Sequence, residues 1–203
     1  MKFFLFFYSL FIGICFPQSY ISFDSSFSKN EKKIANTASE IYYLKNIEKE
    51  VFYYLNLVRI NPKLFAQTFL LENKDNINCL KDYNSLYKQL MNMSPLNPIY
   101  FDDEFYSYAK CHAVNSGKLA YVGHDRKNGS GCDPIISNCS WGECCYYGEN
   151  DPLEIVLNLL VDCNYQDLGH RKIMLSKKFK SMGVYIAPHK LYGFNTVLDF
   201  KDE

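Results

Sequence analysis

Apolar residues recur at helical spacing in the first part of this chain. Within residues 41–59 they fall at intervals of three and four, at Leu44, Ile47, Val51, Phe52, Leu55 and Val58. Such intervals place them on one face of a helix. Asn61-Pro62 predicts the end of this helix, because a residue before proline avoids the α region. Residues 64–71 predict a second helical piece, and the polar, aperiodic residues 72–94 predict a loop insertion carrying one short helix.

Capping signals mark the starts of two later helices. Asp102 or Asp103 can accept hydrogen bonds from the first amides of the helix that follows. Pro152 stands at the first position of another helix, where a missing amide proton has no cost, and Asn150 or Asp151 caps it. Both segments are therefore predicted to be helical.

The remaining pattern predicts a mixed fold. Residues 121–150 combine glycine and cysteine and predict an irregular or hairpin region. A short helix is expected at 170–175. Two strands are expected at 181–187 and 192–200, joined by a turn at 188–190.

The N-terminus is typical of a secretory signal peptide. Lys2 precedes the apolar run 3–16, and Pro17-Gln18-Ser19 ends it. This run is shorter than the roughly 20 residues that span a bilayer, although an uncleaved membrane anchor is the alternative. We therefore predict a signal peptide at 1–18 and a secreted, extracellular protein, with an irregular leader at 19–40.

Charge and length limit the remaining possibilities. The chain has 22 basic and 22 acidic residues, so it lacks the basic excess that nucleic-acid binding requires. No second apolar stretch is long enough for a transmembrane anchor in the mature form. Residues 41–203 are predicted to form one domain.

Cysteines are frequent and uneven in number. Loss of the signal peptide leaves seven disulfide candidates: Cys79, Cys111, Cys132, Cys139, Cys144, Cys145 and Cys163. In an oxidising compartment they are expected to pair, with at least one left over. The cluster from Cys132 to Cys145 could be a metal site, a thiol catalyst or a disulfide-stapled loop, and secretion favours the last.

Two histidines and a glutamate flank this cluster. His124 follows a glycine outside any apolar period, and His170 follows Gly169. Each could be an ordinary loop histidine or part of a site. Glu149 could stabilise the next helix start electrostatically, or act as a metal ligand or general base. Arg171 is expected to make structural hydrogen bonds.

Taken in order, several short motifs resemble the CAP superfamily: the SCP-like domains of cysteine-rich secretory proteins, venom allergens and plant pathogenesis-related proteins. The motifs are Leu55-Asn56-Leu57-Val58-Arg59, Pro95-Leu96, Phe101-Asp102, Ala109 with Ala113, His124, Gly148-Glu149-Asn150, Gly169-His170-Arg171, Phe179, Gly183-Val184 and Val197-Leu198-Asp199-Phe200. The resemblance covers roughly residues 41–200.

This resemblance implies an α+β fold, a three-layer α-β-α sandwich with a shallow cavity. Two histidines and two acidic residues line that cavity, and in some members it holds a divalent metal such as zinc. His124, Glu149 and His170 occupy three matching positions. Glu154 or Asp162 stands in for the fourth, a glutamate on the helix before the second histidine.

The resemblance also implies several alternative functions. Family members are described as sterol or lipid binders, defence and signalling proteins, and proposed hydrolases. We expect a non-catalytic extracellular binding or signalling module whose ligand is a metal, a sterol or lipid, or a protein receptor. The alternative is a metal-dependent hydrolase in which His124 and His170 hold the ion and Glu149 activates water. Insertions near 72–94 and 126–146 distinguish this chain, and the second could cover one edge of the cavity.

Overall fold

The computed structural model describes residues 24–125, 132 and 139–202; the predicted signal peptide lies outside them. The elements in chain order are α2 (Lys29–Ala35), α3 (Asn46–Ile60), α4 (Pro62–Phe65), the π-helical turn η1 (Ala66–Leu70), the 3₁₀ turn η2 (Lys74–Asn76), α5 (Leu80–Asn92), β1 (Tyr100–Phe101), α6 (Asp103–Leu119), β2 (Trp141–Gly148), α7 (Pro152–Val161), α8 (Gly169–Met174), β3 (Phe179–His189) and β4 (Gly193–Asp202). The predicted α+β class is confirmed.

The four strands form one mixed sheet in the order β1-β3-β4-β2. The central pair β3 and β4 is antiparallel, as is the pair β4 and β2, whereas β1 runs parallel to β3. The two strands predicted from sequence are therefore confirmed; β3 extends beyond both predicted ends, and β4 begins one residue later and ends two residues later than predicted. The turn between them lies at 190–192, two residues later than the predicted turn at 188–190, because β3 continues through His189.

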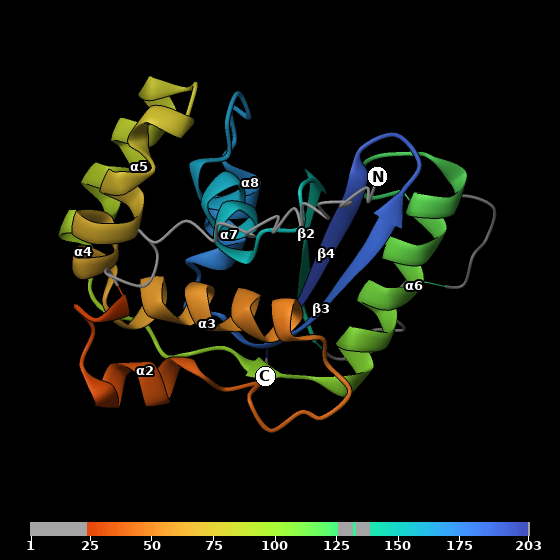
Figure 1. The fold of residues 1–203 in the computed structure, drawn as a ribbon, viewed down its shortest axis with the longest axis horizontal. Coiled ribbons are helices and arrows are strands. Elements are labelled where there is room, and N and C mark those ends of the chain that lie inside the picture. Colours follow the sequence, from red (N-terminus) through yellow and green to blue (C-terminus); the bar gives the residue numbers. More distant parts are fainter. Residues whose placement is uncertain (1–23, 126–131, 133–138, 203) are drawn as a thin grey trace, which may run out of the picture.

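Helices cover both sides of this sheet. Figure 1 shows α6 on one side and α3, α7 and α8 on the other. A small hydrophobic core lies between α6 and the sheet. It consists of small buried residues: Ala109, Ala113, Cys145, Ala187 and Val197. No helix in the described part of the chain is long and apolar enough to cross a membrane.

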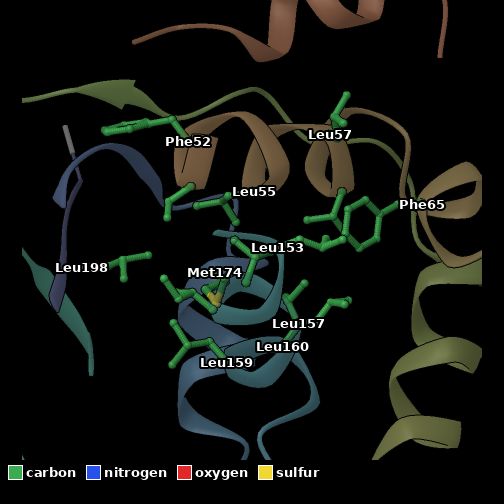
Figure 2. Close-up of a cluster of buried hydrophobic side chains, with 14 of the residues drawn as sticks. Phe52, Leu55, Leu57, Phe65, Leu153, Leu157, Leu159, Leu160, Met174 and Leu198 are labelled. Atoms are coloured by element: carbon green, nitrogen blue, oxygen red, sulfur yellow. The ribbon is translucent and has the colours of Figure 1, made fainter. Parts of the chain in front are cut away.

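The main core lies on the side of α3 and α7. Side chains from α3, α7, α8 and β4 point toward one another there (Figure 2), among them Phe52, Leu55, Leu153, Leu157, Met174 and Leu198. Helix α7 is apolar around most of its circumference, as expected for a helix with most of its surface in the core, and Glu154 and Asn158 are its exposed residues.

A buried arginine connects α3 to the C-terminal end of α8. Arg59 is 1 % exposed, and its guanidinium donates to the carbonyls of Asn97, Met174 and Ser176 at 2.7–2.9 Å. Burial lowers the pKa of Arg59 to about 10, so it stays charged at neutral pH. The last carbonyls of a helix have no partner within it, and this side chain supplies one for α8.

The segment expected to be an irregular leader contains a helix. Ser28 and Glu31 form a capping box at the start of α2, in which the Ser28 hydroxyl accepts from the Glu31 amide. Phe27, Ala35 and Ala38 are buried in the main core. The prediction of an irregular segment throughout residues 19–40 is therefore wrong for residues 29–35.

The polar segment 72–94 also contains more structure than expected. Thirteen of its residues form α5, which buries Tyr83, Leu86 and Leu90 on one face. Intervals of three and four join these apolar positions, but the exposed polar residues between them hide the pattern. A short helix in a loop was predicted, and a full amphipathic helix is present.

The region 121–150, predicted as irregular or a hairpin, includes an eight-residue strand. Strand β2 pairs with β4 along its whole length, from Trp141 opposite Lys201 to Gly148 opposite Phe194. The expected insertion near 126–146 therefore reaches into the central sheet, and residues 141–146 are part of the fold itself. Residues 126–131 and 133–138 lie outside the described part.

Four of the disulfide candidates pair. Cys79, before α5, bonds to Cys163, after α7, and Cys111 on α6 bonds to Cys132. Cys139, Cys144 and Cys145 are thiols, so three cysteines are left over where the odd number required at least one. Cys144 and Cys145 are neighbours on a strand, so their side chains point to opposite faces of the sheet.

Two glycines bring α6 into direct backbone contact with the sheet. A Cβ atom on Gly183 would lie 2.0 Å from the backbone nitrogen of Tyr106, near the start of α6. A Cβ atom on Gly117, near the end of α6, would lie 2.1 Å from the carbonyl oxygen of Pro188. The helix therefore rests on β3 at both ends, with no room for a methyl group.

Gly183→Ala is expected to lower the free energy of unfolding by about 3 kcal/mol, since the helix backbone must move to admit the methyl group. Urea denaturation measures the change. Ser181→Ala on the same strand adds no atoms and should stay within about 0.5 kcal/mol of the parent. A Gly183→Ala protein as stable as the Ser181→Ala control would contradict the close approach.

The two disulfides should contribute unequally, because they close loops of different length. Their partners are 84 and 21 residues apart. Chain-entropy arguments give about 4.6 kcal/mol for the Cys79–Cys163 bond and about 3.3 kcal/mol for the Cys111–Cys132 bond. Paired Cys→Ala variants compared by urea denaturation should show the larger loss for Cys79 and Cys163, and the reverse order would refute this ranking.

Candidate functional site

The first part of the site is built where α7 ends and α8 begins. Asp162 terminates α7 in the left-handed conformation, with φ 56° and ψ 52°. Its carboxylate turns toward α8, where Oδ2 accepts from the His170 amide at 2.9 Å and Oδ1 lies 2.8 Å from His170 Nδ1. One aspartate thus holds both the backbone and the ring of His170.

Arg171, on α8, also stabilises the junction between α7 and α8. Its side chain is buried and donates to the carbonyls of Leu160 and Val161 at 2.6 and 2.8 Å, the last carbonyls of α7. It also reaches Asp82 O and Ser85 Oγ on α5, at 3.0 and 3.1 Å. Burial lowers the pKa of Arg171, while Asp162 and Asp82 oppose that shift. These contacts match the structural role that the sequence indicates for this residue.

Strand β2 supplies the second acidic residue. Side chains alternate between the faces of a strand, so Glu143 and Cys145 share one face and Cys144 occupies the other. Cys144 accordingly packs into the main core, and Cys145 into the small core under α6. Glu143 lies at the start of the strand, where only 6 % of it is exposed.

The loop after α6 brings His124 to Glu143. His124 Nδ1 lies 2.8 Å from Glu143 Oε1. The neighbouring Gly123 adopts φ 99°, donates its amide to Tyr147 Oη at 2.9 Å, and accepts from His112 Nε2 at 3.0 Å. His189 Nε2 similarly donates to the carbonyl of Tyr121 at 3.1 Å. Two histidines outside the predicted site thus position this loop.

His124 and His170 face each other across a small hollow. Their ring centroids are 6.0 Å apart, and Tyr165 packs edge-on against His170 with centroids 5.6 Å apart. The hollow, which we call the histidine cavity, has a volume of about 250 Å³ and is lined by His124, Glu143, Asp162, Tyr165, Asp167, Gly169, His170 and Ile173. The side chain of His124 is 56 % exposed and that of His170 is 14 % exposed, so the cavity opens to solvent beside His124.

In both histidines the Nδ1 atom lies 2.8 Å from a carboxylate oxygen, of Glu143 for His124 and of Asp162 for His170. A carboxylate oxygen accepts hydrogen bonds, so in the neutral ring the proton lies on Nδ1 and the lone pair on Nε2. Backing of an imidazole by a carboxylate is a common arrangement at metal-binding histidines, because it fixes ring orientation and raises basicity. In each ring the acid thus occupies Nδ1, and Nε2 is the nitrogen that can accept a ligand.

The structure places Glu149 and Glu154 elsewhere. Glu149 follows the end of β2 and is exposed, outside the residues that line the histidine cavity. Glu154 accepts from Tyr146 Oη at 2.8 Å on the outside of α7. Of the acidic residues proposed from sequence, only Asp162 lines the cavity with His124 and His170, and the other acids of its lining are Glu143 and Asp167.

A sequence signal for Glu143 was present but ambiguous. The chain contains Gly-Glu twice, as Gly142-Glu143 and Gly148-Glu149. The second copy, followed by Asn150, matches the family motif more fully. Only the strand register distinguishes them, because it puts the first copy beside His124 and the second past the strand end.

Cys145 lies next to the cavity, which bears on the thiol-catalyst alternative. Its Sγ is 3.8 Å from His124 Nδ1. Burial, followed by the charges of Glu143 and Asp199, raises the pKa of Cys145 well above its ordinary value. A nucleophilic cysteine requires the opposite shift, so this thiol is poorly suited to attack a substrate.

Comparison with known proteins identifies the family. No curated protein and no solved structure matches the chain. The model of the cysteine-rich secretory protein (CAP) family matches residues 52–200, which include the second half of α3, strands β1, β2 and β3, most of β4 and every residue of the histidine cavity. The chain therefore belongs to the CAP, or cysteine-rich secretory protein, family.

Proposed function

We propose that this protein is a secreted, non-catalytic binding module whose histidine cavity coordinates a divalent metal ion through His124 and His170. The observation that carries the proposal is the pair of carboxylate-backed imidazoles 6.0 Å apart. Zinc would act there as a binding centre, with His124 and His170 as its protein ligands.

The spacing of the rings suits a single ion. A zinc–nitrogen bond is about 2.0–2.1 Å long, so the centroid of a ligating imidazole lies roughly 3.2 Å from the ion and two such centroids lie within about 6.4 Å of each other. The observed 6.0 Å falls within that span. Glu143 and Asp162 then orient the ligands from behind.

The size of the cavity favours an ion with a small polar partner. Sites for drug-sized organic ligands usually have volumes of about 300–1,000 Å³. The histidine cavity, at about 250 Å³ with three carboxylates in its lining, is small and polar for a sterol or lipid. A lipid or protein receptor would have to bind the wider surface around the cavity mouth.

The acids support binding more than hydrolysis. In a metal-dependent hydrolase one carboxylate must be placed to take a proton from water. Here Glu143 and Asp162 each hold the Nδ1 side of a histidine ring. Both are therefore occupied as orienting groups, and Glu149, the base expected from sequence, lies outside the cavity. Asp167 is the third carboxylate of the lining.

Zinc affinity should depend on both histidines. In isothermal titration of chelator-treated protein with ZnCl₂, His124→Ala and His170→Ala are each expected to weaken binding at the cavity by at least about 100-fold, and Asp162→Asn by about 10–100-fold. Circular dichroism checks that each variant is folded. Undiminished zinc binding in folded His170→Ala would overturn the proposal.

A matched pair of glutamates tests which acid serves the cavity. Glu143→Gln removes the negative charge behind His124 and should weaken zinc binding by about 10–100-fold. Glu149→Gln makes the same chemical change at an exposed position and should leave the affinity unchanged. If Glu149→Gln had the larger effect, the assignment of Glu143 would be wrong.

The hydrolase alternative makes a separate prediction. Zinc-loaded protein assayed with ester and peptide substrates should show no turnover above that of zinc-loaded His124→Ala/His170→Ala protein. Turnover that requires both zinc and Glu143 would favour the hydrolase instead.

A further inference from the structure

Behind His124 lies a second group of metal-ligating side chains. One ligand atom from each of His112, Glu143 and Cys145 lies within 4.8 Å of the other two. We call these three residues the thiol cluster. His112 and Cys145 do not line the histidine cavity, and Glu143 is shared between the two sites.

Three elements of the fold create this convergence. Glu143 and Cys145 are two residues apart on β2, so both face α6. His112 lies on the buried face of α6, with none of its surface exposed. His124 adjoins the group on the solvent side, with Nδ1 3.8 Å from Cys145 Sγ.

The imidazole of His112 has a defined tautomer. Its Nε2 lies 3.0 Å from the carbonyl oxygen of Gly123, which can only accept a hydrogen bond. The proton is therefore on Nε2, and Nδ1 carries the lone pair. A metal-ligating histidine usually donates its other ring nitrogen to a carbonyl or carboxylate in this way.

We propose that the thiol cluster is a second metal site, in which His112, Glu143 and Cys145 bind a divalent ion of zinc-like chemistry. Nitrogen, carboxylate oxygen and sulfur at one point are the donor types that zinc combines in proteins. A thiolate and a carboxylate also neutralise the charge of a divalent ion, which a buried site requires.

Binding should release one proton. A cysteine binds a metal ion as the thiolate, so its sulfur must lose a proton. A divalent ion replaces this proton: the S–H bond breaks, the sulfur keeps the electron pair and donates it to the metal, and the proton passes to solvent. No oxidant or reductant takes part.

Cobalt absorption spectroscopy tests the site, because a thiolate ligand adds a near-ultraviolet charge-transfer band to the spectrum of bound Co²⁺. Chelator-treated full-length protein with its disulfides intact should gain this band on titration with CoCl₂. Cys145→Ser should lose it. Cys144→Ala, which alters the adjacent thiol on the other face of β2, and Cys139→Ser should keep it. His112→Gln should weaken the binding that produces the band by at least about 100-fold.

Failure of this inference is distinguishable from failure of the proposed function. His170→Ala should abolish zinc binding at the histidine cavity and keep the cobalt band, whereas Cys145→Ser should do the reverse. Should Cys145→Ser not fold, the ¹¹³Cd chemical shift of the cadmium-loaded parent protein reports directly whether sulfur is a ligand. Absence of the band in the parent protein, its survival in Cys145→Ser, or a cadmium shift without sulfur character would each overturn the thiol cluster as a metal site.

Discussion

The histidine cavity depends on how the backbone carbonyls at the C-terminal ends of α7 and α8 find hydrogen-bond donors. Backbone carbonyls at a helix end have no partner in their own helix, and leaving them buried without one is costly. Arg171 supplies donors to α7, and Arg59 supplies them to α8. Because each arginine comes from a different helix, α3, α5, α7 and α8 are held as one unit. The hydrogen bonds between Asp162 and His170 form on that unit, so their geometry is set by the core.

The sequence predicts the regular parts of this fold well. Helix α3, strands β3 and β4 and the starts of α6 and α7 follow from periodicity and capping residues, which act locally. Helices α2 and α5 were underestimated because polar and aromatic residues surround a narrow apolar face. Packing against the core stabilises both, and no local pattern records that packing.

The sequence could not predict the parts of the site that depend on contacts between distant elements of the fold. His124 and His170 could be proposed from short motifs, but the choice between Glu143 and Glu149 depends on the register of β2 against β4. Asp162 looked unpromising as the last residue of a helix. Its left-handed backbone turns the carboxylate toward α8, and such a conformation is uncommon for a residue with a side chain. The Cys144–Cys145 pair was similarly ambiguous until the alternation of the strand separated the two thiols.

The close backbone contact between α6 and β3 at Gly117 and Gly183 affects how the size of the histidine cavity can differ between family members. His124 follows this helix by only five residues, and the loop between them is held by contacts to α6 and the end of β3. The separation between helix and sheet therefore determines how high His124 stands above Glu143. Relatives with bulkier residues at the positions of Gly117 and Gly183 would carry the helix farther out and their first histidine with it. Two glycines that do not line the cavity would then determine its dimensions.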